Sequence, residues 1–278
     1  MKRESAISAA IDFGSIAAIS LAICSAATNV DFMSLLVPST ILIRFWAWWK
    51  LGPQTRQRGR FRDEIIFFAI CISIGAFNDW NTVHMHSVYA YLVPTYYPEL
   101  SCVPLWMLLY WGLILRSLST LFHQPFLGHG TIPDNTLRLP WRELQASPGR
   151  KVAIQLLLVA ITRPFVYLFH DHLVLSWLPL LAALALYIYL FPLDPRRWTI
   201  LVLLTTAGPA IEIAYIQLGG LHRYALGWFG GVPAWIVVWW GLAGLIWDDL
   251  GPRLQRKLAP ERARRSTSSD PDRRLPPE

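Results

Sequence analysis

The chain has 278 residues, of which 54% are hydrophobic and only 15% are charged. A soluble domain carries about 25% charged residues, so this composition excludes an ordinary soluble protein and predicts a polytopic integral membrane protein. The net charge of +7 gathers in segments between apolar runs. That pattern is an orientation signal for a membrane protein, and we expect no nucleic-acid partner.

Eight apolar stretches approach the length of about 20 residues that a helix needs to cross a bilayer. We therefore expect an all-α bundle of about eight transmembrane helices, at 6–27, 31–50, 63–80, 102–122, 152–170, 173–192, 198–218 and 231–248. The first stretch also resembles a signal peptide, because Lys2 and Arg3 precede it and Ser25-Ala-Ala27 resembles a cleavage site. Asp12, within that stretch, argues against cleavage.

Positive charge predicts how the bundle is oriented. With eight helices, the basic segments 50–62, 116–151, 196–197 and the tail from Gly251 all fall on the same side as Lys2 and Arg3. The positive-inside rule makes that side the cytoplasm, so both termini are expected there, in a plasma (inner) membrane. We expect 123–150 to be a cytoplasmic connecting segment at the membrane surface and 251–278 to be a disordered basic tail.

The chain also contains an internal repeat. Val103-Pro-Leu-Trp-Met-Leu-Leu-Tyr-Trp-Gly-Leu113 returns as Val232-Pro-Ala-Trp-Ile-Val-Val-Trp-Trp-Gly-Leu242. Each copy is preceded by a tyrosine, by an acid twelve residues before that tyrosine, and by a glycine four residues before the acid; these are Tyr91, Asp79 and Gly75, and Tyr224, Glu212 and Gly208. Repeats of this kind predict two parallel four-helix units, 1–122 and 151–250.

Asp79 and Glu212 are the first candidates for chemistry. A carboxyl inside a membrane helix costs about 2.5 kcal/mol or more, so it faces the bundle interior or a wet cavity. Pro209, one turn before Glu212, opens a gap in the helical hydrogen bonds beside it. The alternative is that the two acids only hold the helices together. Tyr91 and Tyr224 either orient the acids or anchor the chain at the membrane interface.

Histidines gather on the expected outer side. His84, His86 and His222 are candidates for a proton relay, since imidazole titrates near pH 6.5. A divalent metal held by imidazoles and a carboxylate is the alternative, and the third reading is structural histidine at the interface. No other cofactor is expected. The metal set would be His84, His86, His170, Asp171 and His172.

The arrangement of Asp79 and Glu212 with Tyr89-Ala-Tyr91 and Gly231-Val232-Pro233 resembles the membrane carotenoid hydratases of bacteria and archaea. That resemblance implies a membrane-embedded enzyme acting on an isoprenoid.

We therefore expect an enzyme that hydrates, cyclises or isomerises a double bond in an apolar lipid or isoprenoid at the outer side of the membrane. Glu212 would donate the proton and Asp79 would be its partner. The expected partners are membrane lipids and an apolar substrate that enters from the bilayer, with the oligomeric state left open. Two alternatives remain: a small-solute or ion transporter, and a non-catalytic assembly or sensor protein.

Overall fold

The computed structural model describes residues 2–51, 58–127, 136–139 and 142–258. Within these ranges the chain forms eight α-helices, which confirms the all-α prediction. They are α1 (Lys2–Ala26), α2 (Val30–Leu51), α3 (Arg58–Trp80), α4 (Leu105–Phe122), α5 (Pro148–Phe169), α6 (Leu178–Leu190), α7 (Pro195–Gln217) and α8 (Ala234–Leu258). Each of the eight apolar stretches in the sequence overlaps one of these helices, although α6 begins five residues after the start of 173–192 and α8 ends ten residues after the end of 231–248.

Six of the helices in the described part of the chain are long and apolar enough to cross a membrane. These spans are Ala6–Ala26, Val30–Leu51, Phe61–Met85, Leu105–Phe122, Pro148–Phe169 and Pro195–Gln217. The apolar helix α6 is shorter, at 13 residues. Helix α8 is long enough but contains the adjacent acids Asp248 and Asp249. The protein is therefore a multi-pass helical membrane protein.

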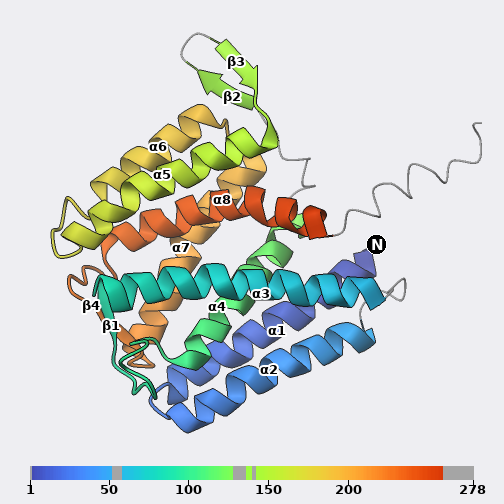
Figure 1. Cartoon of the computed structure of the whole chain (residues 1–278), viewed down its shortest axis with the longest axis vertical. Coiled ribbons are helices and arrows are strands. Elements are labelled where there is room, and N and C mark those ends of the chain that lie inside the picture. The colour runs from blue at the N-terminus through green and yellow to red at the C-terminus, as the bar shows by residue number, and fades with distance from the viewer. Residues whose placement is uncertain (1, 52–57, 128–135, 140–141, 259–278) are drawn as a thin grey trace, which may run out of the picture.

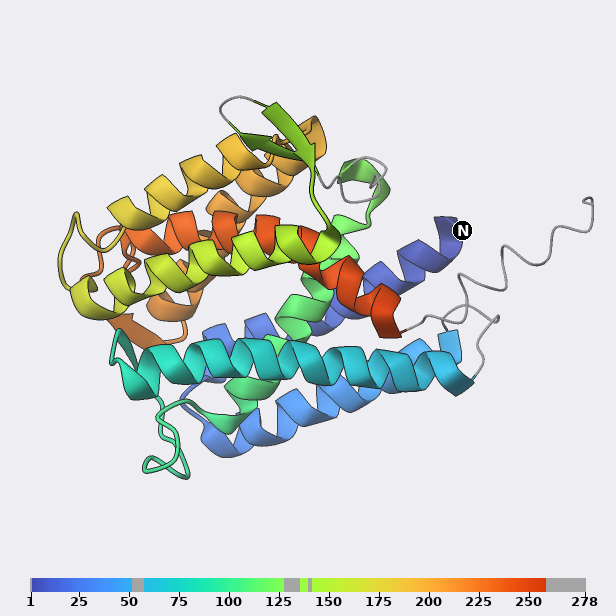
Figure 2. The same cartoon turned by 45° about the horizontal axis from the view of Figure 1, so that its top comes forward.

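The helices run back and forth between two ends of the bundle (Figures 1 and 2). The start of α1 and the end of α8 lie at one end, which we call the terminal end. The loops that follow α3 and α7 lie at the other end, which we call the strand end. Helix α3 packs along α4 and α7 packs along α8. One apolar core is formed mainly by α1–α4, another mainly by α5–α8, and a third joins α3 and α4 to α7 and α8.

A two-stranded sheet at the strand end joins these two groups of helices. Strand β1 (Tyr89–Tyr91) follows a π-helical turn, η1 (Asn81–Met85), at the end of α3. Strand β4 (His222–Tyr224) follows α7. The strands pair antiparallel, with Tyr89 opposite Tyr224 and Tyr91 opposite His222. Segments more than 130 positions apart in the chain are thus held side by side.

The connecting segment and the tail differ in part from expectation. After the short 3-10 helix η2 (Pro125–Leu127), strands β2 (Thr136–Leu139) and β3 (Arg142–Gln145) form a hairpin, where the sequence predicted an amphipathic surface segment. Helix α8 continues to Leu258, so the first residues assigned to a disordered tail are helical. The remaining tail, 259–278, lies outside the described residues.

Candidate functional site

The two acids singled out by the repeat each accept hydrogen bonds from the tyrosine twelve residues later. Tyr91 donates to Asp79 Oδ2 at 2.8 Å, and Tyr224 donates to Glu212 Oε2 at 2.5 Å. Tyr89 also donates to Asp79, at its other oxygen. We call Asp79, Tyr89, Tyr91, Glu212, His222 and Tyr224 the tyrosine–acid cluster.

The short sheet explains why the tyrosines converge. Side chains along a strand point alternately to opposite faces, so Tyr89, Tyr91, His222 and Tyr224 share one face of the β1–β4 pair. That face points into the bundle. Ala90 and Arg223, at the intervening positions, are exposed. The sheet therefore places the phenols of both connecting segments against the two acids.

Two glycines bring a tryptophan close to each acid. A Cβ on Gly75 would lie 2.6 Å from the side chain of Trp111, and a Cβ on Gly208 would lie 2.5 Å from the ring of Trp240. Trp240 donates its indole N–H to Glu212 Oε1 at 2.6 Å. The two indoles stack with centroids 6.5 Å apart. Only glycine permits so close an approach of α4 to α3 and of α8 to α7.

His222 lies at the centre of the tyrosine–acid cluster. Its ring is 5.4 Å from that of Tyr89, 5.8 Å from Tyr91 and 5.3 Å from Tyr224, measured between centroids. Its Nε2 is 3.9 Å from Glu212 Oε2, which is longer than a hydrogen bond. The imidazole is therefore adjacent to the acid without being bonded to it.

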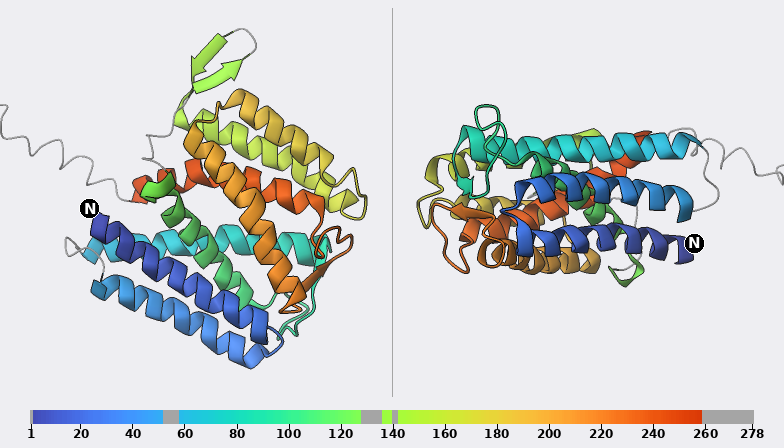
Figure 3. Two further views of the ribbon diagram at one scale, coloured as in Figure 1. Left: turned by 180° about the vertical axis from the view of Figure 1, so that it is seen from behind. Right: turned by 90° about the horizontal axis from the view of Figure 1, so that it is seen from below.

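These groups face a groove of about 350 Å³, which is within the usual range for ligand pockets. Helix α4 lines it from Met107 to Leu121, and α1 and α7 form its walls; Figure 3 shows these two helices diverging on either side of α4. At about 1.5 Å per residue, that stretch of α4 is about 21 Å long. The lining is mostly apolar, and Ile211, on its rim, is 44% exposed.

The groove has one polar end, since Glu212, His222, Tyr89, Tyr91 and Tyr224 all line it. Asp79 is fully buried and does not line it. The carboxyl of Asp79 instead holds two of the tyrosines that do. Glu212 can therefore touch a bound molecule, whereas Asp79 is connected to the groove through its hydrogen bonds with Tyr89 and Tyr91.

Burial raises the pKa values of Tyr89, Tyr91 and Tyr224 well above the usual value of 10, because a phenolate is poorly solvated there. The Asp79 carboxylate raises the pKa values of Tyr89 and Tyr91 further, and the Glu212 carboxylate does the same for Tyr224. All three phenols therefore remain hydrogen-bond donors to the acids.

The other predicted histidines lie outside the groove. His84 stacks on Trp80 with centroids 5.5 Å apart, and its Nδ1 is 3.6 Å from the thiol of Cys102. His86 is exposed and stacks flat on Tyr167 at 4.0 Å. The predicted proton relay required His84 and His86 to lie near Glu212. The structure does not bring either histidine there.

The predicted metal ligands do not converge either. His170 Nδ1 lies 3.2 Å from the backbone oxygen of Tyr167, and the exposed side chains of Asp171 and His172 are 4.0 Å apart. Within the described ranges, no three His, Cys, Asp or Glu side chains form a group that could hold a metal ion.

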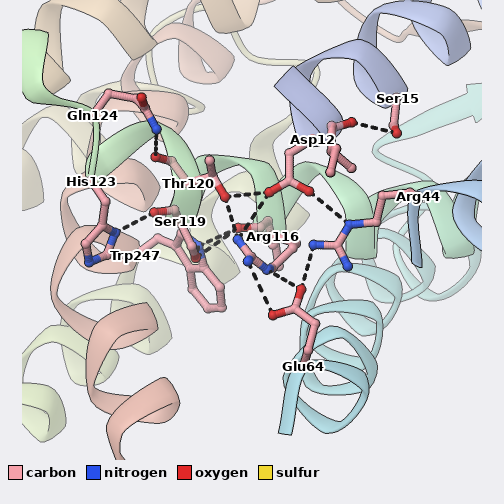
Figure 4. A network of polar contacts seen from close by, with 12 residues as sticks. Asp12, Ser15, Arg44, Glu64, Arg116, Ser119, Thr120, His123, Gln124 and Trp247 are labelled. Atoms are coloured by element: carbon pink, nitrogen blue, oxygen red, sulfur yellow. Dashed lines mark hydrogen bonds and ion pairs between the residues drawn. The ribbon is translucent and has the colours of Figure 1, made fainter. Parts of the chain in front are cut away.

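A second polar centre lies nearer the terminal end, and the sequence reading missed it (Figure 4). Arg44 donates to Asp12 at 2.9 Å and to Glu64 at 2.5 Å, and Arg116 donates to Glu64 at 2.7 Å. Thr120 donates to Asp12 at 2.5 Å. We call these five residues the ion network. Two carboxylates and two guanidiniums balance in charge, and all are buried.

A signal for the ion network was available in the sequence, because each of the first four apolar stretches contains a charged residue of this network. Tyr89 and Trp240 were missed as functional candidates because the repeat contains many aromatics. Their contacts depend on which face of a strand or helix they occupy, and spacing alone does not reveal that.

The fold and the buried polar centres define a helical integral membrane protein with a lined groove. No protein-family model matches the chain, and no curated protein matches it significantly. Two solved structures share its fold. A mycobacterial Insig homologue, MvINS from Mycobacterium vanbaalenii, is 22% identical with a TM-score of 0.51, covering 70% of this chain and 95% of that one. A cross-linked MvINS trimer is 21% identical with a TM-score of 0.52, covering 71% and 96%. At this identity, the similarity shows the fold alone.

Proposed function

We propose that the protein is a membrane-embedded enzyme that performs acid–base chemistry on a double bond of an apolar lipid or isoprenoid. The observation that carries the proposal is the position of Glu212, an ionisable group at the polar end of a mostly apolar groove. A groove lined by apolar side chains with a few convergent polar groups is the usual form of a small-molecule site.

The reaction begins from the protonated form of Glu212, which transfers its proton to one carbon of the double bond. This step forms a C–H bond and leaves a carbocation beside the Glu212 carboxylate. Transfer of a proton from the neighbouring carbon to His222 gives an isomer. Attack by a second double bond forms a ring and a new carbocation, which loses a proton to His222 in the same way. Capture by water, with transfer of one of the water's protons to His222, gives an alcohol. His222, 3.9 Å from Glu212, is placed to return the proton to the carboxyl after a small movement.

The substrate reaches this groove from the bilayer. Ile211 and Phe126 line the groove and are 44% and 71% exposed, so an apolar molecule can enter between α1 and α7 without crossing water. Ser20, Tyr110 and Tyr215 close the groove near the strand end, because their hydroxyls bond one another at 2.6 to 2.9 Å.

The transporter alternative is less well supported. A transport path needs polar groups that are free to bind solute toward both faces of the membrane. The ion network lies beside the groove, since the lining residues Phe13, Ser117 and Leu121 adjoin Asp12, Arg116 and Thr120 in the chain, and its carboxylates are paired with arginines rather than free to bind a solute. We therefore favour a substrate that enters and leaves sideways.

We also propose that the chain consists of two parallel four-helix repeats with both termini in the cytoplasm and the tyrosine–acid cluster in the outer leaflet. This arrangement is supported by contacts that recur at equivalent positions in both halves. In each half a glycine packs against a tryptophan, and an acid accepts a hydrogen bond from a tyrosine. The basic segments at the terminal end support the orientation. The plasma membrane is the compartment we propose.

The test is lipid extraction from a host that expresses the full chain, Glu212→Gln, or the control Glu143→Gln, which changes an exposed hairpin residue. We expect mass spectrometry to detect a changed lipid or pigment with the native chain and with Glu143→Gln. Glu212→Gln should resemble the empty host. Identical lipids in all four extracts would contradict an enzymatic role.

A further inference from the structure

His222 is a buried imidazole with no hydrogen-bond partner. It is 6% exposed, and neither Nδ1 nor Nε2 is hydrogen-bonded within the described part of the protein. A buried polar group that has lost water without gaining a partner is costly and calls for an explanation. Because His222 lines the groove, the partner can be a bound molecule.

The neighbouring side chains do not satisfy the imidazole, since the tyrosine hydroxyls donate their protons to the acids and none of them is hydrogen-bonded to His222. Tyr89 and Tyr91 donate to Asp79, and Tyr224 donates to Glu212. The nearest acid oxygen to His222, on Glu212, is 3.9 Å away. Three tyrosine rings surround the imidazole and exclude bulk solvent from it.

The charges around His222 limit what can bind there. The carboxyls of Asp79 and Glu212 both lie in this cluster, so a phosphate or carboxylate group would be repelled in a site of low polarity. Each carboxyl already receives two hydrogen bonds, Asp79 from two tyrosines and Glu212 from Tyr224 and Trp240. An ammonium group would therefore have to compete with these donors for the acid oxygens.

A neutral oxygen meets these constraints. A hydroxyl can accept from the imidazole N–H or donate to its other nitrogen, and a carbonyl can accept from the N–H. Neither brings a charge into the site. The remaining lining of the groove along α4, from Met107 to Leu121, is apolar except for the hydroxyls of Tyr110 and Ser117, and it is suited to a largely hydrocarbon body.

We propose that the groove binds an amphiphile whose polar group is a single neutral hydroxyl or carbonyl oxygen, hydrogen-bonded to His222, with its apolar body along α4. This inference rests on the proposed function, because it names the substrate class of the same groove. It narrows the class from any apolar lipid to long-chain or isoprenoid alcohols, aldehydes and ketones.

The test uses four probes with the same chain length and different polar groups: oleyl alcohol, 1-octadecene, oleate and oleylamine. Binding to the purified full chain in a non-ionic detergent is followed by tryptophan fluorescence, since Trp111 and Trp240 line the groove. One added hydrogen bond corresponds to about tenfold in affinity. We expect oleyl alcohol to bind about tenfold more tightly than 1-octadecene, and oleate and oleylamine to bind more weakly than the alcohol.

His222→Phe keeps a planar ring and removes both nitrogens. We expect it to abolish the preference for the alcohol while leaving the affinity for 1-octadecene unchanged. His222→Asn, which retains a donor and an acceptor, should restore part of the preference. The matched control is His86→Phe, since His86 is an exposed histidine outside the groove, and it should behave like the native chain.

The outcomes separate the two proposals. Equal affinity of the native chain for the alcohol and the alkene, or a preference for oleate or oleylamine, would overturn the inference about His222 and leave the apolar groove intact. Absence of saturable binding for all four probes would overturn both. The four probes are compared on the native chain without any variant. The inference about His222 therefore remains testable even if a variant fails to fold.

Discussion

Tyr89 and Tyr224 face each other across the β1–β4 pair with ring centroids 5.0 Å apart. Each donates a hydrogen bond to an acid from the helix that precedes its own strand, Tyr89 to Asp79 and Tyr224 to Glu212. The two acids are thereby linked through a pair of phenols. The protein thus joins its two groups of helices at the same place where it exposes an acid to the groove.

The phenols of the tyrosine–acid cluster should resist ionisation. Their pKa values are raised in the folded protein by burial and by the adjacent carboxylates. We expect phenolate absorbance of the folded protein above pH 10 to account for fewer than the 10 tyrosines in the chain, whereas the denatured chain should titrate all of them near pH 10.

The same shift has a consequence for stability. The folded protein holds these protons while the unfolded chain releases them near pH 10, so unfolding becomes more favourable as the pH rises. The stabilisation is fully present below pH 10 and is lost above it. Tyr89→Phe should weaken this alkaline loss, and an unchanged profile in that variant would contradict the assignment.

Gly208→Ala should destabilise the protein. The added Cβ would lie 2.5 Å from the ring of Trp240, so α7 and α8 must move apart, and overpacking of this kind costs about 1–3 kcal/mol. The control is Gly14→Ala, because a Cβ on Gly14 meets nothing within 4 Å. That change should be neutral or stabilise by up to about 1 kcal/mol. Thermal unfolding in detergent measures both, and equal melting temperatures would show that the contact is loose.

Arg116→Met should lower the free energy of unfolding by more than a substitution of an exposed arginine does. It removes one of two cations that balance Asp12 and Glu64 in the buried ion network. Leaving a buried charge without its partner costs about 3–5 kcal/mol. Arg62→Met is the matched control. Arg62 is 76% exposed and its ion pair with Asp63 is 3.6 Å long. Exposed pairs of this kind contribute about 0–1 kcal/mol to stability. Similar melting temperatures for the two variants would contradict a stabilising network.

The proposed orientation predicts which cysteines react from outside the cell. Cys102 is exposed, near the strand end, whereas Cys71 is buried. In a Cys24→Ser, Cys71→Ser background, a membrane-impermeant maleimide should label Cys102 in intact cells. After Cys102→Ser, a cysteine introduced by Arg142→Cys in the exposed hairpin should label only once the membrane is opened. The reverse pattern would invert the orientation.

Much of the site was predictable because its residues occur in an internal sequence repeat. The spacing from Asp79 to Tyr91 matches that from Glu212 to Tyr224, and the structure forms the corresponding hydrogen bond in both places. The length of the apolar stretches then predicted the positions of the eight helices. Repetition and hydropathy carry this information because they depend on spacing and composition, which a single sequence displays directly.

The remainder depended on three-dimensional detail that spacing does not contain. His84, His86 and His222 were equally plausible relay groups, yet a π-helical turn carries His84 and His86 away from the groove while the sheet carries His222 into it. The ion network was missed because Asp12, Arg44, Glu64 and Arg116 come from four different helices. Their pairing follows from how those helices pack.

The β1–β4 pair also bears on how the chain is assembled. It bonds the segment after α3 to the segment after α7, while α4 and α8 contact each other directly. The peptide link between α4 and α5 is thus not the only connection between the halves. If the chain is divided within the hairpin and the two fragments are expressed in the same cell, they should associate in the membrane. The tyrosine–acid cluster would then form again where the two fragments meet.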